Sequence, residues 1–329
     1  MEKKTAAVTR ALSGMTKAFR KAARDIRFHG KDAAPRGLPI KELINYSFEP
    51  IWVDESEVFL ASCARKFSRL YMAGELAWYL SGSQAVDDVS YYSSFWKKCA
   101  GEDGLLNSAY GYHIWYDHDL VTNKDGDVAV MSQFQKVAAQ LQEDTDTRQA
   151  VIHIKDKFHT TDFSNPDVPC TMTLQFFIRD GRLDMIVNMR SSDLIRGISY
   201  DMPFFMIAQK LLAVKLGIKP GWYYHNSGSL HVYELHYDML KRIAEETDVI
   251  EMFEYDGPYI GDIPESETEN ETSINEMLVI EKGLRAAYEN GQDMPDLASL
   301  RELVHPFWWG MIELLVAQFK KKTLNKKDK

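Results

Sequence analysis

The sequence is poor in cysteine. Its 329 residues include only three cysteines, Cys63, Cys99 and Cys170, with no Cys-x-x-Cys pair and no Cys/His cluster. Neither a disulfide framework nor a zinc site is therefore expected, and we expect no metal. A reducing compartment is the simplest setting for such a chain, so we expect a cytoplasmic protein.

Long hydrophobic runs are also missing. The most apolar stretch, residues 307–319, is too short to cross a bilayer and contains Glu313. The basic N-terminal segment has no continuous apolar stretch, which excludes a secretory signal, although its lysines and arginines are compatible with a transit peptide. The spacing of its apolar residues more simply predicts an amphipathic helix at about 6–27.

The chain has no excess of positive charge, since its formal net charge is −9. A general nucleic-acid-binding protein would carry a basic surface, so we expect neither nucleic acid nor a membrane as a partner. With 45% hydrophobic and 12% aromatic residues, the chain can build a substantial core. This balance suits a protein that holds small anionic ligands in a local basic pocket.

The remaining pattern combines helices and strands. Apolar residues at three- and four-residue intervals predict helices at about 56–81, 129–143 and 202–217. "DTRQAVIHI" indicates a strand, and Asp180-Gly181 is a favoured hairpin turn between two apolar or alternating runs. We therefore predict an α+β fold, with a mixed or antiparallel β-sheet covered by helices.

Three parts are expected along the chain. Residues 1–35 form the N-terminal amphipathic helix, and residues 36–260 form the main domain, which includes a strand running into a helix within "GWYYHNSGSLHVYELHYDMLKRIAEE". Residues 261–329 form an acidic linker and a helical extension. The linker is predicted at 261–273 from its acidic, polar composition, and the extension from two helices at about 273–290 and 297–320.

Cys170 is the first candidate for chemistry. It follows a proline at the start of a predicted strand, where a side chain can lie at the end of a sheet. A free cysteine is more often a small buried hydrophobe, and a nucleophile needs nearby cations that favour the thiolate. Arg190 lies at the far end of the partner strand of the same hairpin, which can bring both groups to one sheet end. On position alone, both interpretations stay open.

Further polar candidates have two interpretations each. Residues 190–192 offer a guanidinium and hydroxyls suited to phosphate, or Arg190 forms a surface ion pair with Asp193. His231 and Tyr233 project to one face of a strand and can bind sugar hydroxyls, or form a structural pair. Glu75, inside an apolar helix, is either at the solvent boundary or a buried acid with a shifted pKa.

The order of these residues resembles the thymidylate synthase family. The matching motifs are "DTRQAVIHI", "VPCTMTLQFFIRDGRL", "RSSDLIRG" and "LHVYELH", within a correspondence of roughly residues 36–236, about two-thirds of the chain. The matching positions are Arg36, Glu75, Trp96, Tyr110, Arg148, Cys170, Arg190, Ser191, Asp193, Gly197, Asp201, His231 and Tyr233. The resemblance implies a thymidylate-synthase-like catalytic domain.

The resemblance also implies a mechanism. Cys170 would add to C6 of a pyrimidine nucleotide, and C5 would then attack the one-carbon unit of 5,10-methylenetetrahydrofolate, the co-substrate. Nucleophilic catalysis of this kind divides a difficult bond formation into easier covalent steps. Tyr110 would help to remove the C5 proton, and Glu75 would organise water near the base.

The remaining matched residues would bind the two substrates. Those assigned to the nucleotide are Arg36, Arg190 and Ser191 on the phosphate, and His231 and Tyr233 on the sugar. Arg148 would reach the phosphate from the second subunit of a homodimer. Those assigned to the folate are Trp96, Asp193 and Gly197.

Asp201 departs from the thymidylate synthases, which carry an asparagine there. An asparagine amide complements N3–H and O4 of uracil, whereas cytosine reverses this pattern of donor and acceptor. A carboxyl group that is protonated, or that pairs with a protonated N3, matches cytosine. A helix N-cap is the structural alternative for Asp201, and the two roles are compatible.

Other departures bear on the same question. Thr171 stands where uracil-specific members have histidine, which agrees with the cytidylate 5-hydroxymethylase branch. Gln149 replaces a frequent second arginine, and Arg196 replaces an apolar residue near the folate. The chain also ends in a helical extension instead of the short segment that closes over the folate.

We therefore predict a deoxycytidylate 5-hydroxymethylase. The open alternatives are a CMP 5-hydroxymethylase, a dCMP C5-methyltransferase and, from another class, a catalytically silent nucleotide-binding protein. The sequence leaves ribose versus deoxyribose undecided, because His231 and Tyr233 would contact the 3′ side of the sugar.

Overall fold

The computed structural model describes residues 13–53, 59–62, 64–122, 126–161, 165–246 and 262–327. The chain forms two compact units, each assembled from separate segments. The first unit comprises Met1–Phe67, Ile186–Ile207 and Gly221–Gly257, and the second comprises Ser68–Met185, Ala208–Pro220 and Pro258–Lys329.

The first unit contains a mixed sheet. Its strands are β1 (Lys31–Ala33), β2 (Ile40–Ser47), β3 (Ile51–Trp52), β9 (Ser192–Asp193) and most of β10 (Lys219–Tyr233). The strand order is β1-β2-β10, followed by the end of β8, and β3 also pairs with β10. Since β9 runs parallel to β10 and the other registers are antiparallel, the sheet is mixed, as predicted.

Helices α1 (Gly14–His29) and α6 (Tyr237–Glu245) pack against each other in this unit, which also holds the first half of α5 (Ser199–Lys215). The side chain of Ser13 caps α1, and the apolar stripe of Met15, Phe19 and Ile26 is fully buried. The predicted amphipathic helix is thus confirmed from residue 14 onward, while residues 1–12 lie outside the described part.

The second unit contains the predicted hairpin. Strands β7 (Thr171–Arg179) and β8 (Arg182–Met189) are joined by Asp180 and Gly181, with φ angles of 50° and 71°. These two positive angles are those of the tight turn expected for Asp-Gly. β6 (Val151–His153) adds to β7, so the predicted strand "DTRQAVIHI" is real but only three residues long.

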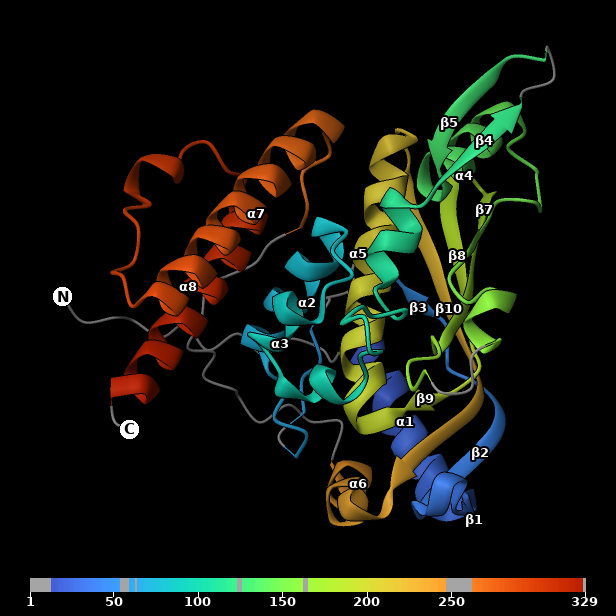
Figure 1. The fold of residues 1–329 in the computed structure, drawn as a ribbon. Helices are drawn as coiled ribbons and strands as arrows, with labels where there is room; N and C mark the ends of the chain where they lie inside the picture. Colours follow the sequence, from blue (N-terminus) through green and yellow to red (C-terminus); the bar gives the residue numbers. More distant parts are fainter. Residues whose placement is uncertain are drawn as a thin grey trace. The chain divides into compact units, whose positions relative to one another are not determined.

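The helices of the second unit are α2 (Arg69–Ser81), α3 (Val86–Ser90), α4 (Gln133–Glu143), α7 (Glu267–Asn290) and α8 (Pro306–Lys327). In Figure 1, α7 and α8 lie side by side, and both pack against α2. Short 3₁₀ or π turns occur in both units: η1 (Pro35–Gly37), η2 (Ser94–Lys98), η3 (Tyr112–Tyr116), η4 (Lys157–Thr160), η5 (Leu194–Ile198), η6 (Glu234–His236) and η7 (Ala298–Leu300). Together with the sheet, these helices give the predicted α+β class.

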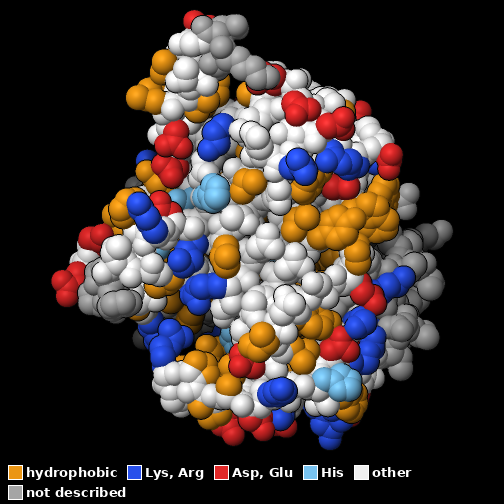
Figure 2. All heavy atoms as spheres, turned by 90° about the vertical axis from the view of Figure 1, so that its right-hand side faces the viewer, with side chains coloured by type: hydrophobic (Ala, Val, Ile, Leu, Met, Phe, Trp, Pro, Cys, Tyr) orange, Lys and Arg blue, Asp and Glu red, His pale blue; other side chains and the backbone are white. Residues whose placement is uncertain are grey.

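A second hairpin, β4 (His118–Thr122) with β5 (Val128–Ser132), was not predicted. It replaces the start of the helix expected at about 129, because Ser132 forms a capping box and begins α4 at the next residue. Leu120, Val128 and Val130 on this hairpin are exposed. In Figure 2, hydrophobic side chains reach the surface in the upper part of the view, where this hairpin lies.

The predicted helix at 56–81 was wrong for residues 59–62 and 64–68, which are not helical, while residues 56–58 and 63 lie outside the described part. Residues 64–66 form a turn in which Lys66 has a φ of 48°, and the side chain of Ser68 accepts a hydrogen bond from the backbone N–H of Tyr71. A positive φ interrupts a helix and the serine caps the next one, so α2 begins at Arg69.

The predicted acidic linker was also wrong for its second half. α7 begins at Glu267, six residues earlier than expected. Acidic side chains of this segment pair with lysines of the same unit, as in the 2.7 Å contact between Lys210 Nζ and Asp262 Oδ1. Lys215 with Glu267 and Lys219 with Glu265 form similar pairs. The second helix of the extension starts at Pro306 instead of about 297.

Among the described residues, no helix is both long enough and apolar enough to cross a membrane.

Candidate active site

In the first unit, the segment that follows β8 lies directly against β10. The backbone N–H of Ser229 donates to the carbonyl of Arg190 at 3.2 Å. A Cβ at Gly228 would lie only 2.8 Å from that carbonyl oxygen, so this approach requires glycine. The side chain of Arg190 is exposed and that of Ser191 is half-buried, so both predicted phosphate ligands lie at a fixed backbone position.

The pairing of β9 with β10 places Asp193 opposite His231. One carboxylate oxygen of Asp193 accepts hydrogen bonds from the backbone N–H groups of Ile195 at 2.8 Å and Arg196 at 3.0 Å. His231 is buried and packs edge-on against Tyr233, with ring centroids 5.2 Å apart. The predicted sugar-binding pair and Asp193 therefore lie together, with Asp193 fixing the turn η5.

Asp201 lies in the first turn of α5. Burial raises the pKa of its carboxyl to about 7, and the neighbouring carboxylate of Asp193 adds to the shift. Gly197 leaves room for this group, since a Cβ there would lie 3.0 Å from Asp201 Oδ2. Within the described part of the chain, no residue donates a hydrogen bond to Asp201. Because α5 begins at Ser199, Asp201 lies inside the helix and does not cap it, while Asp193 caps η5.

Two fully buried side chains on β10 extend this polar region. The hydroxyl of Tyr223 and Nδ1 of His225 are 2.7 Å apart. Burial lowers the pKa of His225 to about 3, so its ring is neutral. Burial, with a contribution from the charge of Asp201, raises the pKa of Tyr223 well above its ordinary value. This unit therefore favours uncharged forms of its buried groups around Asp201.

Arg65 is a site residue that the sequence did not reveal. Its Nε donates to the carbonyl of Ile195 at 2.6 Å and its Nη2 donates to the hydroxyl of Ser199 at 3.2 Å. These bonds hold the turn η5 and the start of α5 from the outside. The apolar spacing predicted Arg65 inside a regular helix, which concealed this role.

Arg36 and Arg196, two further cations of the first unit, are exposed. Arg36 lies in the turn before β2 with a φ of 53°. Arg196 donates from Nε to Nε2 of His236 at 3.2 Å, and its guanidinium lies 5.9 Å from the ring centre of Tyr233. Burial lowers the pKa of His236, as expected for an imidazole nitrogen that accepts from an arginine.

In the second unit, Glu75 and Trp96 are joined by a residue that the sequence did not single out. The hydroxyl of Tyr71 donates to Glu75 Oε1 at 2.7 Å, and the indole N–H of Trp96 donates to that hydroxyl at 2.9 Å. Glu75 is only 8% exposed, so its side chain is buried and does not lie at the solvent boundary. The i, i+4 spacing of Tyr71 and Glu75 on α2 is the signal that could have found the pair.

Tyr110 lies beside the same helix. Its ring stacks on that of Tyr79 at 5.4 Å between centroids, and it is 5% exposed. The next residue, Gly111, approaches α2 so closely that a Cβ would lie 1.7 Å from the carbonyl oxygen of Tyr79. Glycine is therefore required at the position that brings Tyr110 to α2.

Cys170 is partly exposed and lies immediately before β7. The loop that leads to it is fixed by Asp167, whose carboxylate accepts from the backbone N–H of Ser108 at 2.8 Å and from its hydroxyl at 2.5 Å. This link ties the Cys170 loop to the segment that carries Tyr110. The pKa of Cys99 is raised to about 11 by burial and by the charges of Asp167 and Cys170.

Arg148 is exposed in the segment before β6, where its carbonyl accepts from the side chain of Gln175 at 2.9 Å. Its predicted reach into a partner subunit stays a prediction. Among the described residues, no group of three or more His, Cys, Asp or Glu side chains could hold a metal ion.

Comparison with known proteins defines the class. Residues 17–252 match the family model described as thymidylate synthase, so the chain belongs to the thymidylate synthase family. Members of this family are folate-dependent one-carbon transferases that act on nucleotides.

Particular relatives narrow the comparison. The deoxycytidylate 5-hydroxymethyltransferases of Enterobacteria phages T4, T2 and T6 are each 29% identical over 212 residues, or 61% of this chain and 78% of theirs. Among solved structures, the thermostable thymidylate synthase A from Bacillus subtilis has a TM-score of 0.55 and 20% identity, covering 70% of this chain and 84% of that one. This likeness shows a shared fold.

Proposed function

We propose that the protein is a deoxycytidylate 5-hydroxymethylase that uses 5,10-methylenetetrahydrofolate. The observation that carries this proposal is Asp201, a carboxyl with a pKa of about 7 and no hydrogen-bond donor among the described residues. The phage relatives named deoxycytidylate 5-hydroxymethyltransferase support the same assignment.

A carboxyl with this pKa is suited to cytosine. In its protonated form it donates through O–H to N3 of the ring and accepts from the 4-amino group through its carbonyl oxygen. Uracil offers N3–H and O4 instead, so the ionised carboxylate would accept from N3–H but face O4 with a second acceptor. A mismatched buried polar pair costs about 1–3 kcal/mol, which is a selectivity of about 5- to 150-fold.

The proposed chemistry begins at Cys170. Its thiolate adds to C6 of the cytosine ring, and the electrons move to C5, which attacks the methylene carbon of the folate. Tyr110 helps to remove the proton from C5 while tetrahydrofolate leaves, which produces an exocyclic methylene group. Water then adds to this methylene, and the Cys170 thiolate is released from C6.

Glu75 determines the second half of the reaction in this proposal. Hydride from tetrahydrofolate would convert the methylene to a methyl group, whereas water converts it to hydroxymethyl. Because Tyr71 holds one carboxylate oxygen of Glu75 at 2.7 Å, the carboxylate has a fixed orientation from which it can position that water. Trp96, bonded to the same hydroxyl, would lie near the folate.

The remaining assignments concern binding and assembly. We assign the phosphate to Arg36, Arg190 and Ser191, with Arg148 from the partner subunit of a homodimer, the sugar to His231 and Tyr233, and the folate to Trp96, Asp193 and Gly197. The catalytic domain is residues 36–260, and the enzyme acts on cytoplasmic nucleotides. The exposure of Arg148, Arg36 and Arg190 supports their roles, since a phosphate must approach from solvent.

One assay tests the proposal. The protein is incubated separately with dCMP, CMP and dUMP, each with methylenetetrahydrofolate, and the product masses are measured. A dCMP product heavier by one CH₂O unit is expected, and a Cys170→Ser variant should give none. A product heavier by CH₂ indicates a methyltransferase, preferential conversion of CMP indicates the ribonucleotide enzyme, and no product with any nucleotide indicates a silent binder.

A further inference from the structure

The C-terminal hairpin of α7 and α8 is a part of this chain that the family match does not include. The matched residues end at 252, whereas α7 begins at Glu267. The two helices are tied together by the buried bond from the indole N–H of Trp308 to Asn270 Oδ1 at 2.9 Å. Since both helices pack against α2, which carries Glu75, this addition can act on the proposed chemistry.

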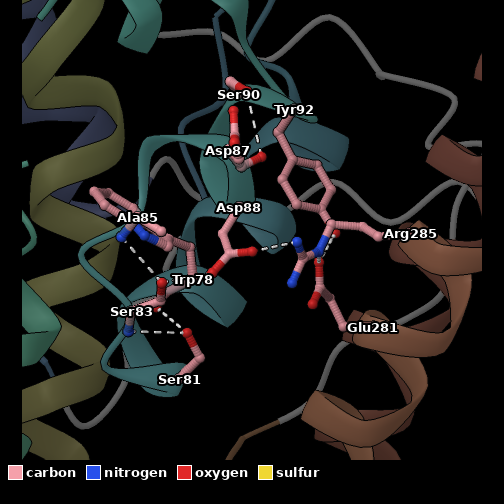
Figure 3. Close-up of polar contacts among 10 residues, drawn as sticks. All are labelled: Trp78, Ser81, Ser83, Ala85, Asp87, Asp88, Ser90, Tyr92, Glu281 and Arg285. Atoms are coloured by element: carbon pink, nitrogen blue, oxygen red, sulfur yellow. Dashed lines mark hydrogen bonds and ion pairs between the residues drawn. The ribbon is translucent and has the colours of Figure 1, made fainter. Parts of the chain in front are cut away.

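A partly buried ionic network joins α7 to the segment after α2. Nε of Arg285 lies 2.7 Å from Glu281 Oε1, and the same arginine binds Asp88 of α3 through Nη1. The hydroxyl of Tyr92 donates to the same oxygen of Glu281 at 2.6 Å. Figure 3 shows Asp88, Tyr92, Glu281 and Arg285 converging between α3 and α7.

This network is expected to add little to the free energy of unfolding, because its charged groups lose hydration when they are buried. Glu281 is 6% exposed, and burial is also the main cause of the raised pKa of Tyr92. The desolvation of a buried ion pair often cancels its attraction, so apolar residues would stabilise the same contact at least as well. What the network does provide is a single fixed position for the ring of Tyr92.

The ring of Tyr92 lies directly on the backbone of α2. A Cβ added at Gly74 would lie 2.2 Å from Cδ1 of that ring, so the contact exists only because residue 74 is glycine. Gly74 immediately precedes Glu75, whose carboxylate is oriented by Tyr71. A displacement of the Tyr92 ring would therefore move the backbone next to the buried acid.

We propose that α7 is a positioning element for Glu75, acting through the Arg285–Glu281–Tyr92 network and the contact between Tyr92 and Gly74. The inference rests on the proposed function, in which Glu75 positions the water that adds to the exocyclic methylene. Tyr92, Glu281 and Arg285 are positioning residues, since they act on the chemistry only through α2.

The test compares Tyr92→Phe with a matched control, Tyr91→Phe. Both changes remove one buried hydroxyl, but the hydroxyl of Tyr91 has no hydrogen-bond partner among the described residues. Arg285→Met is the second test variant, because it removes the cation of the network from the α7 side and leaves Tyr92 unchanged. For each full-length variant, kcat and KM for dCMP, the share of methyl product, Tm and hydrogen exchange of peptide 69–81 are measured.

We expect Tyr92→Phe and Arg285→Met to lower kcat about 10-fold with little change in KM for dCMP, because a positioning error acts on the reacting geometry. We also expect a larger share of methyl product and faster hydrogen exchange in 69–81, while Tyr91→Phe behaves as the wild type. If both test variants match Tyr91→Phe in kcat, product share and exchange, the inference is wrong. Lower Tm with unchanged kcat and product share would also overturn it, since the network would then be merely structural.

The same measurements distinguish a failure of this inference from a failure of the proposed function. The wild-type protein would then give no hydroxymethyl product, while hydrogen exchange of 69–81 would still report whether α7 holds α2. Wild-type exchange in both test variants would refute the structural coupling itself, whatever the substrate.

Discussion

At the scale of single residues, the state of Asp201 links burial to substrate choice. Its pKa of about 7 means that the carboxyl carries a proton about half of the time near neutral pH. An asparagine cannot vary in this way, and a fully exposed aspartate would be ionised. Gly197 and Asp193 are therefore as important to the proposal as Asp201, since one gives it space and the other disfavours its charge.

Asp201 should also make stability depend on pH. Its folded pKa of about 7 lies above its ordinary value of 3.8, so between these values the unfolded chain releases a proton that the folded protein keeps. The contribution of Asp201 to the free energy of unfolding, measured against the Asp201→Asn variant, is therefore fully present below about pH 4 and is lost as the pH rises to about 7. We expect the free energy of unfolding of Asp201→Asn, relative to that of the wild type, to increase by about 1–2 kcal/mol between pH 5 and pH 8. This magnitude follows from about 1.4 kcal/mol per pKa unit, reduced because the Asp201 side chain is partly exposed. Urea unfolding at both pH values measures it. An equal difference at both pH values would contradict the pKa.

Tyr71 provides a second test at this scale. Tyr71→Phe removes the hydroxyl that joins Trp96 to Glu75, so we expect kcat to fall about 10- to 100-fold with a smaller change in KM for dCMP. The matched control is Tyr116→Phe, which also removes a hydroxyl bonded to α2, at the carbonyl of Leu80. Steady-state kinetics of both variants decide the point, and equal losses of kcat would show that Tyr71 has no special role.

At the scale of elements, close backbone contacts determine where the site residues lie. Gly228 and Gly111 each allow an approach that a side chain would prevent, one at the Arg190 segment and one at α2. Such contacts explain why loops carrying Arg190 and Tyr110 can be placed accurately without extensive apolar cores of their own.

Gly228→Ala should therefore disturb phosphate binding. The new Cβ would lie 2.8 Å from the carbonyl oxygen of Arg190, so this segment must shift. We expect KM for dCMP to rise about 10-fold, comparable with the loss of one hydrogen bond to a charged group. Gly283→Ala is the control, because a Cβ there meets nothing within 4 Å and alanine favours a helix. Kinetics indistinguishable from the wild type would refute the role of this contact.

The elements also show what the sequence can and cannot predict. The β7–β8 hairpin and α5 were predictable because their signals, Asp180-Gly181 and a long apolar run, are local. The start of α2 was mispredicted because apolar spacing continues past Lys66, whose positive φ is not encoded by that spacing. The acidic segment before α7 was mispredicted because its lysine partners lie some fifty residues earlier in the chain.

Some residues of the candidate site could also be predicted from the sequence, and others could not. The matched residues were found by their order, and the structure joins Glu75 to Trp96 and places Asp193 opposite His231. Arg65 was missed because a hydrogen bond to a partner 130 residues away leaves no periodic signal in the sequence. Tyr71 was missed although its i, i+4 spacing to Glu75 is a local signal.

At the scale of the whole molecule, the open question is assembly. The exposed Arg148 is proposed to complete the phosphate site of a partner subunit in a homodimer. A symmetric dimer would then contain two sites, each built from residues of both chains.

Mixed dimers test this arrangement. Arg148→Ala and Cys170→Ser should each be nearly inactive alone, but mixing dissociated subunits should restore about a quarter of wild-type activity. Half of the dimers are then mixed, and one of their two sites has both an intact cysteine and an intact partner arginine. Light scattering should give a mass of twice 37.8 kDa. No recovery in mixed dimers would place Arg148 in its own subunit's site or outside any site.

The central claim is that the acid at position 201 selects cytosine, and one ratio tests it most directly. The value of kcat/KM for dCMP divided by that for dUMP is measured for the wild type and for Asp201→Asn near pH 7. We predict that the wild-type ratio exceeds one and that the substitution lowers it at least about 30-fold, since a penalty of about 1–3 kcal/mol is removed for one base and imposed on the other. An unchanged ratio, with both proteins folded and active, would contradict the account.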